Sequence, residues 1–335
     1  MKPLLLSDIP IEDTRPPEPE GPPLSWAFST DRNQKAAWRL YWVSEPVMGG
    51  LNYVTHHALR LLTVSGCSRF GAALAPFARA RFAKSNFARR IEKNLSTLRP
   101  DRAASDEDLN ALLTSWWDNI GRVFAEFSVT NRHFKAGLVE VSGKEHFEAI
   151  RSRGQRVIFV SVHVGHWEAQ MFALAEAMGT VLIGPFQPEP SRFTNRLVYQ
   201  LRKRRGQFLF PPGRKSAFRL NRLLQEREAN ALIYVDDVRD RQIHLPLFGR
   251  PAPDRGNAVA AIKLAMANDA ALIPVYMVRT EGAHYHLRML PPIEPASGSG
   301  RAEDIRRTIE ALNSALEPVV LEHIDQWYML AELRF

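Results

Sequence analysis

Residues 154–179 constrain the fold of this 335-residue chain more than any other stretch. Residues 156–162 form a short, β-branched apolar run, which is typical of a strand buried on both faces. Residues 166–178 are rich in Ala, Met, Leu and Glu and stop at Gly179, as a helix should. The stretch therefore predicts a strand, a tight junction and a helix. In parallel α/β sheets, ligands bind beside such junctions, at the carboxyl ends of the strands.

Polar side chains gather at this junction. His163 would leave the strand, Glu168 would lie in the first turn of the helix, and Gly165 would let the backbone bend between them. A carboxylate beside an imidazole fixes its tautomer, so that the other ring nitrogen can act as a base. The spacing thus predicts a catalytic pair of His163 and Glu168, although many proteins contain such a spacing by chance.

The composition limits the classes of protein and of partner. An apolar content of 45% and a charged content of 24% indicate a globular chain, large enough for one α/β domain or two smaller ones. A single cysteine, Cys67, excludes an internal disulfide framework and suits a reducing compartment. The net charge of +8 favours an anionic partner, with a solvated basic surface as the alternative. Nucleic acid is the weaker choice, because no zinc-knuckle spacing or aromatic RNA-binding box occurs.

The N-terminal quarter is expected to form an arm followed by helices. Residues 1–23 are rich in Pro and Glu and contain no signal peptide, so this composition predicts a flexible segment. Residues 40–64 have too many polar interruptions for a transmembrane span. Residues 38–87 mix cations with apolar and aromatic residues, which predicts helices in the headgroup layer of an anionic membrane or, alternatively, a helical lid. We therefore expect a flexible arm over 1–35, a helical membrane-surface region over 36–88 and a catalytic domain over 89–335.

The pattern after residue 138 alternates between strands and helices. It predicts an α/β fold with a mostly parallel central sheet flanked by helices, preceded by an N-terminal helical membrane-associated region. Two helices are expected between residues 89 and 134, the second starting with a capping box of Ser105 and Asp108. The apolar strand at 231–235 ends in Asp236 and Asp237. Two acids at this edge of a sheet indicate a metal, a base or a polar substrate.

The motifs at these positions resemble one known family. His163-Val-Gly-His-Trp-Glu168 resembles the His-x-Gly-Asn-Trp-Glu signature of the bacterial lipid A biosynthesis acyltransferases, the late enzymes that transfer a lauroyl or myristoyl chain, within the glycerolipid acyltransferase superfamily. The chain departs from the signature at His166, where the family has Asn; that residue is not the family's base. Further matches extend the resemblance over residues 89–335: Arg89-Arg-Ile-Glu-Lys-Asn-Leu95, which resembles the family's Arg-x-x-x-Asn-Leu stretch, Arg202-x-Arg204-x-Gly206, Asp236, Leu247-Phe-Gly-Arg-Pro-Ala252, Pro274-Val275 with Arg279, and Gln326-Trp327.

This resemblance implies an O-acyltransferase that moves a fatty acyl chain from an acyl carrier protein thioester to a hydroxyl of a Kdo-bearing lipid A precursor, in lipopolysaccharide biosynthesis. It implies that His163 is the base and Glu168 its partner. The residues expected to bind substrate are Arg202, Arg204, Asp236 and Arg279. Guanidinium groups suit phosphate because they can donate two parallel hydrogen bonds.

The resemblance also implies a place and a set of partners for such an enzyme. It would lie on the cytoplasmic face of the inner membrane, as a peripheral or monotopic protein. It would need no cofactor and no metal. Both the acidic carrier protein and the anionic glycolipid acceptor suit a basic chain. Nucleic acid is not an expected partner.

The sequence also allows three other interpretations. The acceptor could be another glycolipid or a phospholipid. A metal-dependent hydrolase could use His163, His166, Asp236 and Asp237, although the usual His-Glu-x-x-His helix is absent. A non-enzymatic membrane-binding or carrier-binding module is the third, and the intact His163 and Glu168 count against it. A serine nucleophile is disfavoured, because no Gly-x-Ser-x-Gly elbow occurs.

Overall fold

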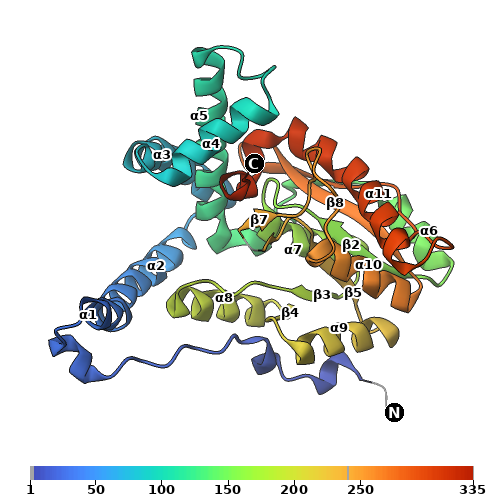
Figure 1. Cartoon of the computed structure of the whole chain (residues 1–335), viewed down its shortest axis with the longest axis horizontal. Helices are drawn as coiled ribbons and strands as arrows, with labels where there is room; N and C mark the ends of the chain where they lie inside the picture. The colour runs from blue at the N-terminus through green and yellow to red at the C-terminus, as the bar shows by residue number, and fades with distance from the viewer. Residues whose placement is uncertain (1–3, 240, 335) are drawn as a thin grey trace.

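A seven-stranded sheet forms the centre of the computed structural model, which describes residues 4–239 and 241–334 (Figure 1). In spatial order the strands are β1 (Val139–Ser142), β9 (His284–Met289), β8 (Ala270–Glu281), β2 (Arg156–Ser161), β5 (Asn230–Tyr234), β3 (Leu182–Pro185) and β4 (Phe208–Phe210). Only β8 and β9 pair antiparallel in this sheet. A separate two-stranded ribbon joins β6 (Val238–Arg239) to β7 (Gln242–Ile243). The predicted α/β fold with a mostly parallel central sheet is confirmed.

Helices cover both faces of the sheet. On one face lie α9 (Arg214–Gln225), α10 (Asn257–Asn268) and α11 (Arg301–Glu322), and on the other lie α6 (Lys144–Ser152) and α7 (Trp167–Met178). The side chains of β2 alternate between the two resulting cores: Ile158 and Val160 join the first, Val157 and Phe159 the second. Because both faces are buried, the strand reads as one continuous apolar run in the sequence. Helix α8 (Arg192–Arg204) packs beside the edge strand β4.

A helical region precedes the sheet. It consists of α1 (Arg32–Arg39), η4 (Leu40–Ser44), α2 (Glu45–Leu59), α3 (Val64–Phe82), α4 (Asn86–Leu98), α5 (Asp106–Glu126) and η5 (Phe127–Arg132). Helices α1 and α2 project from the body, whereas α3, α4 and α5 group together (Figure 1). The predicted cap of α5 is present, since the Ser105 hydroxyl accepts the N–H of Asp108 at 3.1 Å. In the described part of the chain, no helix is both long enough and apolar enough to cross a bilayer.

Helices α3 and α5 pack closely because glycines face each other at their crossing. A Cβ atom added to Gly71 would lie 2.3 Å from the carbonyl oxygen of Gly121, closer than any real contact. Gly71→Ala should therefore push the helices apart and lower the free energy of unfolding by roughly 1–3 kcal/mol. Urea unfolding measures this as a lower midpoint with an unchanged slope. Gly50→Ala in α2 is the matched control, since open space surrounds that position; equal midpoints for the two variants would contradict the prediction.

The N-terminal segment, residues 4–20, lies along α8 and α9. Its acidic side chains pair with cations of those helices: Glu12 with Lys203 at 2.6 Å, Asp13 with Lys215 at 3.3 Å and with Arg219, and Glu18 with Arg196 at 2.6 Å. Exposed pairs of this kind stabilise a fold by only about 0–1 kcal/mol each. The first three residues of the predicted flexible arm lie outside the described residues.

Candidate active site

Two polar side chains meet at the carboxyl ends of the two neighbouring strands β2 and β5. The last residues of these strands, Ser161 and Tyr234, are register partners. His163 and Asp236 each follow two residues later, so the parallel register brings them to the same level of the sheet edge. The imidazole Nδ1 of His163 lies 2.7 Å from Oδ1 of Asp236, and the backbone N–H of His163 donates to Oδ2 at 2.8 Å.

The surroundings hold this pair in one orientation. Asp236 is fully buried, and its Oδ2 also accepts the indole N–H of Trp327 at 3.0 Å. The ring of Tyr234 stacks on the imidazole with centroids 4.2 Å apart. Gly165 makes the turn that follows, with φ at +60° and no room for a Cβ beside the carbonyl of Met277. The predicted use of this glycine is confirmed.

The second ring nitrogen of His163 is the one available for chemistry. Because the carboxylate accepts the proton on Nδ1, the neutral imidazole keeps a lone pair on Nε2. No residue within 4–239 and 241–334 hydrogen-bonds to Nε2, and 22% of the side chain is exposed. Such an imidazole can take a proton from a hydroxyl group, with Asp236 stabilising the imidazolium that forms.

The carboxylate that holds His163 is Asp236 and not Glu168, which corrects the expected geometry. Glu168 does lie in the first turn of α7, but its Oε1 accepts from Nη2 of Arg202 at 3.1 Å. Asp236, expected to bind substrate, is buried behind the imidazole instead. A role of Glu168 in catalysis stays a prediction, and in this structure it would act through Arg202.

The basic end of α8 contributes two arginines to the neighbourhood of Glu168. Arg202 lies over Phe186 at 4.6 Å, and Arg205 lies over Phe172 at 5.1 Å. In the described part of the chain, Nε of Arg202 and Nη1 of Arg205 are buried without a hydrogen-bond partner. Burial lowers the pKa of Arg205 to about 10, although the charge of Glu168 acts in the opposite direction.

Arg204, which the sequence motif predicts as a substrate-binding residue, is exposed to solvent, unlike Arg202 and Arg205. Residues three apart share a face of a helix and residues two apart do not, so the helical period alone would have paired Arg202 with Arg205. Arg202 and Arg205, in contrast, are partly buried.

Arg279, also expected to bind substrate, belongs to the core. Its side chain is 9% exposed, its Nη1 lies 2.8 Å from Oε1 of Glu126, and its Nε donates to Asn119 at 3.1 Å. Its backbone N–H donates to the side chain of Gln326 at 2.8 Å. These contacts tie the C-terminal segment to β8 and leave the guanidinium no route to a substrate.

The four ligands of the hydrolase interpretation are not brought together. His163 pairs with Asp236, whereas Asp237 accepts the N–H of Asn257 at 3.0 Å, at the start of α10. His166 points into the interior beside Glu126. Within residues 4–239 and 241–334, the grouping able to hold a metal ion does not include His163, Asp236 or Asp237. The structure therefore does not group the four side chains that the hydrolase interpretation requires.

Trp327 supports the pair of His163 and Asp236, because its indole N–H donates to Oδ2 of the fully buried Asp236. Trp327→Phe keeps the buried ring but removes that donor, and the loss of one hydrogen bond to a buried charge costs about 1.5–3 kcal/mol. We expect kcat to fall about tenfold or more, with KM unchanged, because the variant misplaces the base and not the substrate. Steady-state kinetics measure the split. A raised KM at constant kcat would contradict this role.

Comparison with known proteins assigns the chain to a family. The model of the family described as "Bacterial lipid A biosynthesis acyltransferase" matches residues 46–334. No curated protein sequence matches the chain. Among solved structures, the 1-acyl-sn-glycerophosphate (LPA) acyltransferase PlsC from Thermotoga maritima matches with 12% identity and a TM-score of 0.34, over 63% of this chain and 88% of that chain. Since the family model spans most of the sequence and includes both His163 and Asp236, the chain belongs to the bacterial lipid A biosynthesis acyltransferase family.

Proposed function

We propose that this acyltransferase moves a lauroyl or myristoyl chain from an acyl carrier protein thioester to a hydroxyl of a Kdo-bearing lipid A precursor. The observation that carries the proposal is the imidazole of His163, held by Asp236 with Nε2 unpartnered within the described residues. Transfer to an alcohol needs a base, and a thioester brings its own good leaving group. The reaction belongs at the cytoplasmic face of the inner membrane, where both substrates meet.

The proposed step is a direct transfer. Nε2 of His163 takes the hydroxyl proton as the acceptor oxygen attacks the thioester carbonyl carbon. The new C–O bond forms, the C–S bond breaks, and the imidazolium returns the proton to the departing thiolate. Asp236 lowers the barrier because a fixed buried carboxylate stabilises the imidazolium without reorganisation.

Two arginines near Glu168, Arg202 and Arg205, suit the phosphate of the acceptor. Arg202 and Arg205 lie on one face of α8, beside the helix that begins at Trp167. Both side chains are partly exposed, and rotations of their guanidinium groups would bring the buried, unpartnered N–H groups to phosphate oxygens. The N–H groups of Val164 and Gly165 already donate to the carbonyls of Val162 and Gln326, so they are not free to meet a developing oxyanion.

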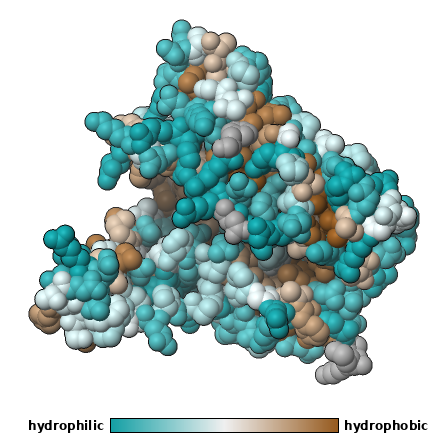
Figure 2. Space-filling view, viewed as in Figure 1, coloured by the Kyte–Doolittle hydropathy of each residue, from teal (hydrophilic) through white to brown (hydrophobic). Residues whose placement is uncertain are grey.

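The N-terminal helices suit the membrane surface. In α2, Val47, Leu51 and Val54 are 57–65% exposed, and in α3, Phe70, Leu74 and Phe77 are 43–73% exposed. Each set has the spacing of one helical face. Figure 2 shows apolar atoms on the projecting arm formed by α1 and α2. A soluble domain rarely leaves so many large apolar side chains in water, whereas a monotopic helix inserts them among lipid headgroups.

Removing two of these side chains should weaken membrane binding. The double variant Phe70→Ser and Phe77→Ser should bind vesicles containing anionic lipid at least about tenfold less tightly, since each buried aromatic side chain contributes on the order of 1.5–3 kcal/mol when fully buried. Vesicle flotation measures the bound fraction. Phe218→Ser is the matched control, because this exposed side chain lies on α9, away from α2 and α3. Equal flotation of all three proteins would contradict a docking role for α3.

The substrates can be tested directly. The purified protein is incubated with acyl carrier protein thioesters of different chain lengths and with a panel of acceptors: Kdo-bearing lipid A precursor, the same precursor without phosphate, and a phospholipid. Mass spectrometry of the lipids should show one added C12 or C14 acyl group on the phosphorylated precursor only. Acylation of the phospholipid alone, or hydrolysis without transfer, would overturn the proposed acceptor.

A further inference from the structure

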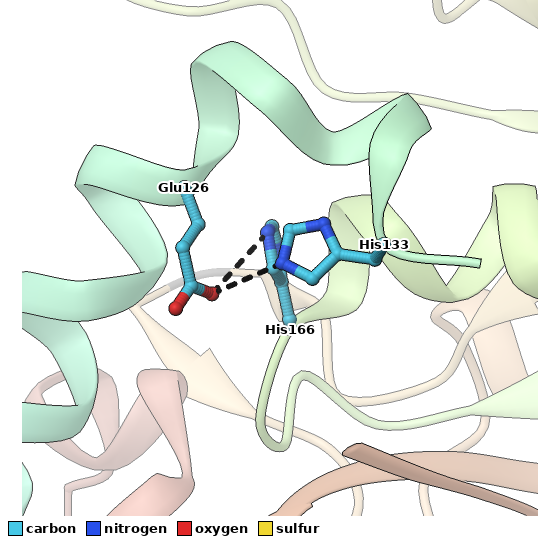
Figure 3. A group of neighbouring side chains, drawn as sticks. All are labelled: Glu126, His133 and His166. Atoms are coloured by element: carbon cyan, nitrogen blue, oxygen red, sulfur yellow. Dashed lines mark ion pairs between the residues drawn. The ribbon is translucent and has the colours of Figure 1, made fainter. Parts of the chain in front are cut away.

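A second cluster of titratable side chains lies in the interior and includes His166, three residues after His163 (Figure 3). Glu126 ends α5, His133 follows η5, and His166 precedes α7. All three side chains are at most 1% exposed. Oε2 of Glu126 lies 3.4 Å from Nε2 of His133 and 3.9 Å from Nε2 of His166, and the three candidate ligand atoms lie within 4.8 Å of one another.

The polar atoms of this cluster are not satisfied by protein groups. In the described part of the chain, both ring nitrogens of His166 and Nε2 of His133 are buried without a hydrogen-bond partner. Buried polar atoms are normally paired, so three orphaned nitrogens, two of them within 3.9 Å of one carboxylate oxygen, need an explanation. His166 also stands where the signature described above has Asn, so this chain has gained an imidazole at a site that faces a second one.

We propose that Glu126, His133 and His166 bind one divalent transition-metal ion, with Zn²⁺ as the best chemical match. Two imidazoles and one carboxylate are a recurring protein ligand set for zinc. Zinc bonds of about 2.0–2.1 Å in a tetrahedral arrangement place ligand atoms roughly 3.4 Å apart. The 3.4 Å and 3.9 Å separations approach this spacing, and side-chain rotations that bring all three ligand atoms, now within 4.8 Å of one another, closer together would complete the set.

Two neighbours limit the affinity of this metal site. Arg279 lies 2.8 Å from Oε1 of Glu126, so its positive charge opposes a dication on the other oxygen. The hydroxyl of Tyr285 donates to Oε2 and must turn away or join the ion as a fourth ligand. The site is closed to solvent and separate from the base, so the role that follows is structural. The ion would fasten the end of α5 to the turn that carries His163, and it would take no part in the acyl-transfer step.

The test uses the purified full-length protein and counts metal. Protein incubated with excess Zn²⁺ and then desalted should hold one equivalent by elemental analysis, and Co²⁺ in its place should give the visible absorption of a low-symmetry site. His166→Asn should reduce the bound metal to near zero. His284→Asn is the matched control, since that side chain is exposed on β9 and should leave one equivalent bound.

Further measurements separate loss of the site from loss of the fold. The wild-type Tm should rise when Zn²⁺ is added and fall on chelation, because a ligand that binds only the folded state stabilises it. His133→Gln should also lose the metal, and circular dichroism checks that each variant is folded. Absence of metal from wild-type protein, or one full equivalent in folded His166→Asn, would overturn the proposal. Because metal content needs no substrate, the result stands apart from whether the protein transfers an acyl chain.

Discussion

His163→Ala should lower kcat/KM for acyl transfer by about 10,000-fold, the upper end of what a positioned general base contributes. The variant removes the group that accepts the hydroxyl proton, and no neighbour can replace it. Asp236 is buried behind the ring, and the phenol of Tyr234 already donates to the carbonyl of Trp167 at 2.8 Å. A radiolabelled acyl carrier protein thioester, followed into the lipid fraction, measures the residual rate.

Two observations make this result interpretable. His284→Ala changes an exposed histidine on β9 and should retain the wild-type rate. Removing the ring takes one hydrogen bond from the buried carboxylate of Asp236, so the midpoint of urea unfolding should fall, and circular dichroism checks that the assayed variant is folded. If folded His163→Ala transferred acyl groups at the wild-type rate, the base would have to be another residue.

Asp236→Asn should lower kcat by about 1,000-fold while changing KM little. The amide is the same size as the carboxylate, but it cannot stabilise an imidazolium, and it can turn the ring to the tautomer with its proton on Nε2. Because the substrate touches His163 and not Asp236, binding is preserved and the loss appears in kcat. Single-turnover kinetics with saturating donor measure the chemical step directly.

The neighbouring acid provides the control for this second variant. Asp237→Asn alters a side chain that caps α10 through the N–H of Asn257, and the amide oxygen can keep that hydrogen bond. It should cost at most a few-fold in kcat. If instead Asp236→Asn stayed active and Asp237→Asn did not, the wrong carboxylate would have been assigned to the imidazole.

Local patterns in the sequence predicted most of the elements, because each pattern lies within one segment. The strand at 156–162 and the helix ending at Gly179 agree with β2 and α7 to within one residue at each end. The glycine that ends α7 has φ at +57°, as the helix stop implied. Helix α5 begins after the expected Ser105, whose hydroxyl accepts the N–H of Asp108 as in the first half of a capping box.

The pairing of side chains across segments could not be predicted in the same way. Glu168 is near His163 in sequence, but partnership depends on which strand lies next to β2 and in which register. With Ser161 opposite Tyr234, the equal offset to His163 and Asp236 would have identified the pair. The motif also favoured Arg204, where the helical period favours Arg205. Glu126 and His133 escaped notice because the fold alone brings them to His166.

The position of the proposed proton-transfer pair, directly after β2 and β5, has a consequence for how such enzymes can diversify. Both side chains are held by the innermost strands of the sheet, whereas the arginines of α8 and the apolar faces of α2 and α3 lie outside it. Changes in the outer helices can thus alter which lipid is chosen and leave the chemistry untouched. Substrate preference can therefore evolve in the outer helices while the sheet that carries the reacting side chains stays the same.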